Sequence, residues 1–355
     1  MPNRHNILLN GIGCPIGGGR AVLQHLLNNV PSKIDVRAIL PYVKKLGKFE
    51  TPGNVKSSYF NHNLWGMYLR PFLEIQNNLG MIFNKYDCII NISNYGLCFT
   101  HHQLLYIHNP FILDLNSIKH FGGGHPNFLN RYALKTYLKN AECIILQTDH
   151  MFNNLVEFCD ICNIPLPKNV KILKPYPIIY NDFSKIIKPF KFSFFYPTTN
   201  FPHKQTDLAI NSIIYANKFN KDIGLSITKK TNIDLKGVKF LGRIQPREVC
   251  SWFDASEALI FTSTRETLGL PLLEALYFGK PAVLPDLPYA REIYGEAAVY
   301  YKGNQPKNVC KAILELMNNY NYYILKASER KKIEWSYRKS WTESWKIMLN
   351  CFNIK

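Results

Sequence analysis

Short apolar runs alternate with amphipathic segments along most of the chain. Such runs predict buried parallel strands, and the segments between them space their apolar residues as helices do. In the first half the pattern predicts strands at residues 6–11, 35–40, 87–92, 104–107 and 143–146, with a helix at 19–29. In the second half it predicts strands at residues 192–196, 224–227, 238–241, 259–261 and 282–284. This alternation is typical of a doubly wound α/β fold.

The two sets of strands are separated at residues 174–177, where two prolines exclude regular structure. A chain of 355 residues is too long for one ordinary core, so we expect two domains. We place the first domain at residues 1–180 and the second at 190–334. The tail at 335–355 is rich in Trp and is predicted to form an amphipathic helix.

Composition limits the class of protein further. Met1 leads directly into the first predicted strand without resembling a signal peptide. No apolar run approaches the roughly 18 to 20 residues that span a bilayer, so we expect a soluble or peripheral protein. The nine cysteines are scattered and odd in number, which fits free thiols in a reducing cytosol. Cys159 and Cys162 lack the further ligands of a zinc site, and no metal cofactor is expected.

The net charge of +18 does not by itself identify a binding partner. Residues 40–49 and Lys56, followed by Trp65, Tyr68, Arg70 and Phe72, interleave basic and aromatic side chains, which suits anionic lipid headgroups. A solvated surface over an aromatic core explains the same pattern, and AT-rich coding sequence also raises the Lys content. Nucleic acid is not an expected partner, because no helix-turn-helix, RNA-recognition or zinc-finger pattern is present.

Candidate chemistry is densest at residues 265–276, where Glu266 and Glu274 flank a Gly-Leu-Pro turn. Pro271 suits the first turn of a helix that follows a buried strand. The backbone N–H groups of Thr267, Leu268 and Gly269 are then placed to meet an anion or a hydroxyl. Both carboxylates can accept hydrogen bonds from one ligand, which suggests a sugar-nucleotide site. The alternative is that Glu274 only solvates a helix face and Glu266 caps the helix.

The segment 258–301, with its two glutamates, Gly269-Leu270-Pro271 and the runs at 279–286 and 291–293, resembles the donor-site signature of glycosyltransferase family 4. It is similar to bacterial polysaccharide and O-antigen mannosyltransferases. Thr267-Leu268 stands where Gly-Phe is usual. The resemblance implies the GT-B fold, in which two Rossmann-like doubly wound domains face a cleft. The first domain would serve the acceptor, the second would bind the nucleotide sugar, and the C-terminal helix would cross back onto the first.

The same resemblance implies roles in the second domain. Glu266 would orient the hydroxyls of the donor sugar and Glu274 would hold the ribose. Lys204, in a turn after the predicted strand at 192–196, matches the phosphate-binding lysine of the family. Many members carry Arg six residues earlier, where this chain has Thr198. Arg243, at the end of another predicted strand, is a candidate for the missing charge.

In the first domain, Gly18 and Gly19 match the paired glycines that face the donor diphosphate in the family. A dinucleotide-binding turn is the alternative, but Pro15 interrupts it and the second strand ends without an acidic residue. His108 follows a buried strand and resembles the family histidine that contacts the donor sugar; a core histidine is the plain alternative. The glycine-rich loop at 122–125 would shape the acceptor site or simply lie on the surface.

Together these features predict a retaining glycosyltransferase that moves a hexose from a nucleoside-diphosphate sugar to a saccharide or polyprenyl-linked acceptor, in surface polysaccharide assembly. Glu266 and His108 are the expected catalytic residues, and domain closure would exclude water. The expected location is the cytoplasm, with attachment to the inner face of the membrane left open. Two alternatives remain: another GT-B sugar-nucleotide enzyme, such as a soluble-acceptor synthase or epimerase, and an NAD-dependent dehydrogenase or noncatalytic nucleotide binder.

Overall fold

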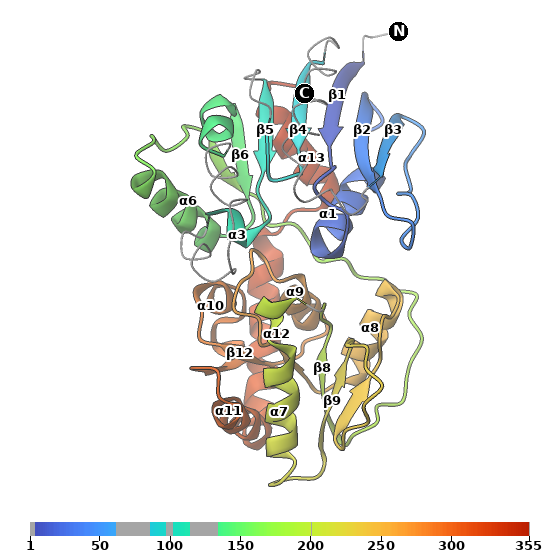
Figure 1. Ribbon diagram of the computed structural model, residues 1–355, viewed down its shortest axis with the longest axis vertical. Coiled ribbons are helices and arrows are strands. Elements are labelled where there is room, and N and C mark those ends of the chain that lie inside the picture. Colours follow the sequence, from blue (N-terminus) through green and yellow to red (C-terminus); the bar gives the residue numbers. More distant parts are fainter. Residues whose placement is uncertain (1–3, 62–85, 97–101, 114–133, 200, 355) are drawn as a thin grey trace. The chain divides into compact units, whose positions relative to one another are not determined.

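The computed structural model describes residues 4–61, 86–96, 102–113, 134–199 and 201–354 (Figure 1). Two compact units form the chain: Met1–Pro175 with Lys339–Lys355, and Tyr176–Arg338. The boundaries thus lie at Pro175 and Arg338, where the sequence analysis placed them at 180, 190 and 334. The glycine-rich loop at 122–125 and the residues Trp65, Tyr68, Arg70 and Phe72 lie outside the described residues.

The first unit is built on a parallel sheet whose strands lie in the order β3-β2-β1-β4-β5-β6-β7. The strands are β1 (His5–Asn10), β2 (Ile34–Tyr42), β3 (Val55–Asn61), β4 (Cys88–Asn91), β5 (Gln103–Tyr106), β6 (Cys143–Leu146) and β7 (Val170–Ile172). Its described helices are α1 (Gly17–Asn28), α3 (Pro110–Leu113), α6 (Asp149–Ile161) and α13 (Trp341–Asn350). Apolar residues of α1 and α13 share one core with the sheet, and those of α6 pack in the core of its other face.

The second unit repeats this design with strands in the order β10-β9-β8-β11-β12-β13. The strands are β8 (Phe192–Tyr196), β9 (Ile223–Ile227), β10 (Val238–Phe240), β11 (Ala258–Ile260), β12 (Ala282–Pro285) and β13 (Ala298–Tyr301). The helices are α7 (Thr206–Ala216), α8 (Pro246–Ala255), α9 (Leu270–Tyr277), α10 (Pro288–Tyr294), α11 (Pro306–Asn318) and α12 (Tyr320–Tyr337), with 3-10 turns η1 (Pro202–Lys204) and η2 (Gly295–Ala297). Open sheets of this kind place ligand groups where the strand order reverses, here between β1 and β4 and between β8 and β11.

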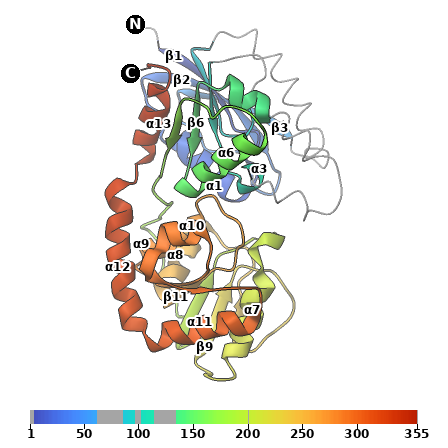
Figure 2. The same ribbon diagram turned by 90° about the vertical axis from the view of Figure 1, so that its left-hand side faces the viewer.

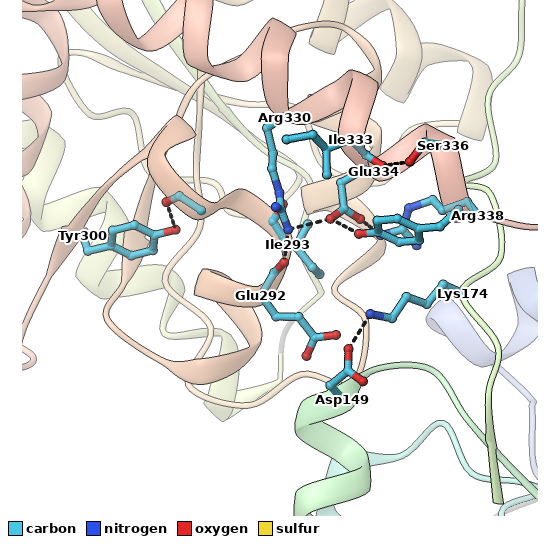
Figure 3. A network of polar contacts seen from close by, with 12 residues as sticks. Asp149, Lys174, Glu292, Ile293, Tyr300, Arg330, Ile333, Glu334, Ser336 and Arg338 are labelled. Atoms are coloured by element: carbon cyan, nitrogen blue, oxygen red, sulfur yellow. Dashed lines mark hydrogen bonds and ion pairs between the residues drawn. The ribbon is translucent and has the colours of Figure 1, made fainter.

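The C-terminal segment differs from the single helix predicted from residue 335. The helix α12 ends at Tyr337, and Glu334 near its end accepts hydrogen bonds from Arg330, Tyr337 and Arg338 (Figure 3). The side chain of Glu334 is 1% exposed, and these donors satisfy its buried charge. The backbone of Arg338 is extended, which prevents the helix from continuing.

A new helix, α13, begins after Ser340, whose hydroxyl accepts from the backbone N–H of Glu343 at 3.1 Å. The Glu343 carboxylate accepts from the backbone N–H of Ser340 at 2.8 Å, which completes a capping box. Figure 2 shows α12 running along the second unit and α13 lying on the first. Trp345 of α13 is fully buried, and its indole N–H donates to the carbonyl of Leu26 in α1 at 2.7 Å.

We expect Trp345→Ala to lower the free energy of unfolding by about 3–5 kcal/mol, because it removes a large buried ring and leaves the Leu26 carbonyl without its donor. Lys346→Ala is the matched control, since Lys346 is the exposed next residue of the same helix. Urea unfolding of both variants tests this. Equal unfolding midpoints would show that α13 does not stabilise the first unit.

Within the described residues, no helix combines the length and the apolar character that crossing a bilayer requires.

Candidate functional site

Two predicted residues meet at the switch point of the second sheet. Lys204 ends η1, which follows β8, and Glu266 lies in the loop after β11. The Lys204 ammonium and the Glu266 carboxylate form an ion pair, with side chains 15% and 13% exposed. Partial burial strengthens such a pair relative to one on the surface. The structure therefore joins a cation and a carboxylate that lie 62 positions apart in the sequence.

The backbone that carries Lys204 is clamped to the end of β11. The Tyr196 hydroxyl donates to the carbonyl of Lys204 at 2.7 Å, and the Thr262 hydroxyl lies 2.9 Å from the same carbonyl. The N–H of Thr264 donates to the carbonyl of His203 at 2.8 Å. Tyr196 and Thr262 are fully buried, so the Lys204 turn is held on rigid elements. The sequence analysis missed this clamp, although the polar residues directly after the buried run 258–261 were the available signal.

Glu274 has a different environment from that of Glu266. It lies inside α9 and is partly exposed, and burial raises the pKa of its carboxyl group to about 8. Among the described residues, no donor or cation contacts its carboxylate. Burial raises the pKa of the Cys250 thiol on α8, and the nearby charge of Glu274 adds to this shift. A carboxyl group without a partner and with a perturbed pKa is typical of ligand sites.

The turn before α9 is buried and depends on a glycine. Thr267 and Leu268 are 7% and 2% exposed. Gly269 caps α9 in the left-handed region, with φ of 60°, and no side chain caps the helix. An added Cβ at Gly269 would also lie 2.7 Å from the Leu272 side chain. Glycine is therefore needed here.

Arg243, expected to supply a second cation for the diphosphate, stays a prediction. The N–H and carbonyl of Thr198 both bond to the Thr228 hydroxyl at 2.7 Å. Arg243 is exposed after β10, the edge strand, which lies two strands from β8, and the structure does not join it to the Lys204–Glu266 pair. Lys229 follows β9, the direct neighbour of β8, and forms an ion pair with Asp207 in the first turn of α7. Asp207 comes three residues after Lys204, so Lys229 is a candidate that the sequence analysis missed.

The first unit brings Gly19 and His108 together. An added Cβ at Gly19 would lie 2.8 Å from Cε1 of His108, so the imidazole edge rests against the glycine turn. Gly17 has φ of 64°, and α1 begins after Ile16 without a side-chain cap. Gly18 is in the first turn of α1, where N–H groups favour anions. His108 follows β5, and Nε2 of its ring lies 2.7 Å from the carbonyl oxygen of Ile92.

Two doubly wound units, with polar and charged groups gathered at both switch points, define a two-domain α/β protein of the GT-B class. The fold is similar to that of sucrose-phosphate synthase from Thermosynechococcus elongatus, with a TM-score of 0.72 and 12% identity over 94% of each chain. It is also similar to the pneumococcal O-GlcNAc transferase GtfA, solved with UDP and GlcNAc, with a TM-score of 0.68, 11% identity and 99% of each chain covered.

Residues 228–334 match the family described as glycosyl transferases group 1, so this part of the chain is similar to that family. The serotype-specific mannosyltransferase WbdA of Escherichia coli is 32% identical over 114 residues, which are 32% of this chain and 13% of WbdA. The O-antigen chain mannosyltransferase RfbU of Salmonella typhimurium is 21% identical over 259 residues, covering 66% of this chain and 70% of RfbU. The predicted resemblance to glycosyltransferases and the GT-B fold are thus confirmed.

Proposed function

We propose that the protein is a retaining glycosyltransferase that moves a hexose from a nucleoside-diphosphate sugar to a saccharide or lipid-linked saccharide acceptor. The observation that carries the proposal is the Lys204–Glu266 pair beside the N-terminus of α9, which no side chain caps. The similarity to the mannosyltransferases WbdA and RfbU supports mannose as the first hexose to test and O-antigen or related surface polysaccharide as the product. The UDP in the GtfA structure supports a nucleotide donor site in this fold.

The pair suits a donor site because each of its charges has a natural ligand partner. A diphosphate would draw the Lys204 ammonium away from Glu266 through charge-assisted hydrogen bonds. The Glu266 carboxylate would then accept hydrogen bonds from the sugar hydroxyls. The departing nucleoside diphosphate gains negative charge during transfer, and fixed positive groups stabilise it. Lys204, the first turn of α9 and Lys229 would supply these groups, with Lys229 replacing the arginine that the family often has at the position of Thr198.

Glu274 is suited to accept hydrogen bonds from the hydroxyl groups of the ribose. A partly buried carboxyl group that has no partner among the described residues gains most from hydroxyl donors, which also favour its charged form. Gly18, Gly19 and His108 keep their predicted roles toward the diphosphate and the donor sugar. We also propose a cytoplasmic site of action at the inner face of the membrane, where lipid-linked acceptors occur, with the positive net charge as the supporting observation.

A thermal-shift screen against GDP-mannose, UDP-glucose and UDP-N-acetylglucosamine tests the donor site, with NAD as the comparison ligand. We expect one nucleotide sugar to raise the unfolding temperature of the wild type and to lose this effect in Lys204→Ala. Lys191→Ala is the matched control, because Lys191 precedes β8 at the opposite end of the same strand and is 82% exposed. Stabilisation by NAD alone would contradict the proposal and favour a dehydrogenase.

A further inference from the structure

Two cysteines meet where the C-terminal segment packs on the first sheet. Cys143 begins β6, and Cys351 directly follows α13, 208 positions further along the chain. Both side chains are buried in the core that α1 and α13 share with the sheet, and both are free thiols. Their sulfur atoms lie 2.7 Å apart. The fold therefore brings together two thiols that no short sequence spacing connects.

The two sulfurs are close enough for a covalent bond to form between them. A disulfide has an S–S distance of about 2.0 Å, so the atoms need to approach by only a fraction of an ångström. Cys143 is held by the ladder that pairs β6 with β5 and β7, whereas Cys351 is the C-cap of α13. Because helix ends move more readily than central strands, this approach can come from the end of α13.

The surroundings make the two thiols unequal. When Cys351 is ionised, the Cys143 thiol donates to its sulfur; this hydrogen bond is the main reason that the pKa of Cys351 is lowered to about 7, and the charge of Lys171 on β7 adds to it. The same hydrogen bond, together with burial, raises the pKa of Cys143. The negative charge of Glu142 opposes the ionisation of both. Cys351 also keeps 8% of its surface exposed, whereas Cys143 keeps none. Since the thiolate is the nucleophile, Cys351 reacts first.

Other thiols of the first unit are less reactive. Cys88 begins β4 in the same core, and burial is the main cause that raises its pKa, with nearby negative charges, including that of Cys351, adding to it. Burial also raises the pKa of Cys159 in α6 to about 11. Both thiols are therefore protonated at neutral pH, and they can serve as controls for the reactivity of Cys351.

We propose that Cys143 and Cys351 form a redox modification site, at which hydroperoxides oxidise the pair to a disulfide that links the end of α13 to β6. This inference is independent of the proposed glycosyl transfer. In a reducing compartment the pair stays in the thiol form, and the disulfides that do form there are typically transient and redox-sensing. The site would respond to a rise in peroxide, and thiol reductants would restore it by exchange.

The reaction consumes one hydrogen peroxide for each disulfide. The Cys351 thiolate attacks one peroxide oxygen, the O–O bond breaks, and the departing hydroxide takes up the proton that Cys351 lost, which gives water. The Cys143 sulfur then attacks the sulfur of the resulting Cys351 sulfenic acid. The S–O bond breaks, and the hydroxyl group leaves with the proton of Cys143 as a second water. The two thiols lose two hydrogens and two electrons, and the peroxide is reduced to two waters.

Peptide mapping of the oxidised full chain tests the pairing. The protein is treated with hydrogen peroxide at neutral pH, the remaining thiols are blocked with N-ethylmaleimide, and the unreduced digest is analysed by mass spectrometry. We expect a linked peptide pair that joins Cys143 to Cys351 and that dithiothreitol separates, while Cys159 carries the blocking group. Cys88→Ala is the matched control and should form the same link, whereas Cys351→Ala should not.

Hydrogen exchange of the oxidised and reduced protein measures what the link does. The disulfide should slow exchange of the backbone amides of α13 by at least about 10-fold, because it tethers the end of the helix to β6. Exchange in α7 of the second unit should stay the same. A link from Cys351 to Cys88, no link at all, or unchanged exchange in α13 would overturn the proposal. Neither measurement uses a sugar nucleotide, so a failure here is distinguishable from a failure of the proposed function.

Discussion

Replacing either Glu266 or Lys204 by alanine is expected to lower kcat/KM by about 100-fold to 1,000-fold, because each change removes a preorganised charge from the reacting end of the donor. The two residues form one ion pair, so their effects should not multiply. The kcat/KM of the double variant should be at most about 10-fold lower than that of the less active single variant. Initial rates of nucleoside diphosphate release measure all three. Fully multiplicative losses would show that the residues act independently.

The stability of these variants gives the control. Each single change leaves the other charge partly buried without its partner, which should cost roughly 1–3 kcal/mol of unfolding free energy. The double variant should recover part of that loss, since no unpaired charge remains. Glu266→Gln keeps the size of the side chain and separates charge from packing. If a single variant is unfolded at the assay temperature, its rate says nothing of the site, and the Gln variant replaces it.

Replacing Glu274 by glutamine is expected to stabilise the protein at alkaline pH while weakening nucleotide binding. The folded-state pKa of this carboxyl group is about 8, above its ordinary value of 4.5. The folded state therefore holds the proton more tightly than the unfolded state, so the contribution of Glu274 to stability is largest below pH 4.5 and is lost as the pH rises toward 8. Glutamine is neutral at every pH and avoids this loss.

At about pH 9, Glu274→Gln should raise the free energy of unfolding by roughly 1–2 kcal/mol. The gain is limited because the Glu274 side chain keeps some exposed surface, where solvent screens its charge. At about pH 5 the free energies of unfolding of the wild type and the variant should be similar. Urea unfolding at both pH values measures the difference, and Glu296→Gln, whose side chain is 76% exposed, is the matched control. The same pH dependence in the wild type and in Glu274→Gln would mean that Glu274 is an ordinary solvated residue, as the plain alternative held.

The central strands of both sheets were predictable from the sequence. The run Cys143–Leu146 is apolar throughout and is buried along its whole length. Such a continuous apolar run is typical of a central strand in a parallel sheet. The edge strands β3, β7 and β13 were missed. The strands β3 and β7 contain exposed and half-buried positions and lack a continuous apolar run. The break between α12 and α13 was also missed. Three tryptophans near helical spacing suggested one helix, whereas the buried Glu334 network and the Ser340 cap end one helix and begin another.

The residue types of the candidate site could be predicted, but their contacts could not. Local spacing indicated Glu266 and Lys204, yet their pairing depends on the adjacency of β8 and β11, which the sequence does not state. The absence of a described partner for Glu274 depends on how α8 and α9 pack. The contact between Cys143 and Cys351 gave no signal either, since these residues lie 208 positions apart and meet only when α13 packs on the first sheet.

The most direct measurement is donor turnover by the purified full chain, followed by NMR of the anomeric proton of the product. We predict that one nucleoside-diphosphate hexose is consumed, that the product keeps the anomeric configuration of the donor, and that Lys204→Ala loses this turnover while Lys191→Ala retains it. Turnover by Lys204→Ala at the rate of the wild type, or an inverted product, would contradict it.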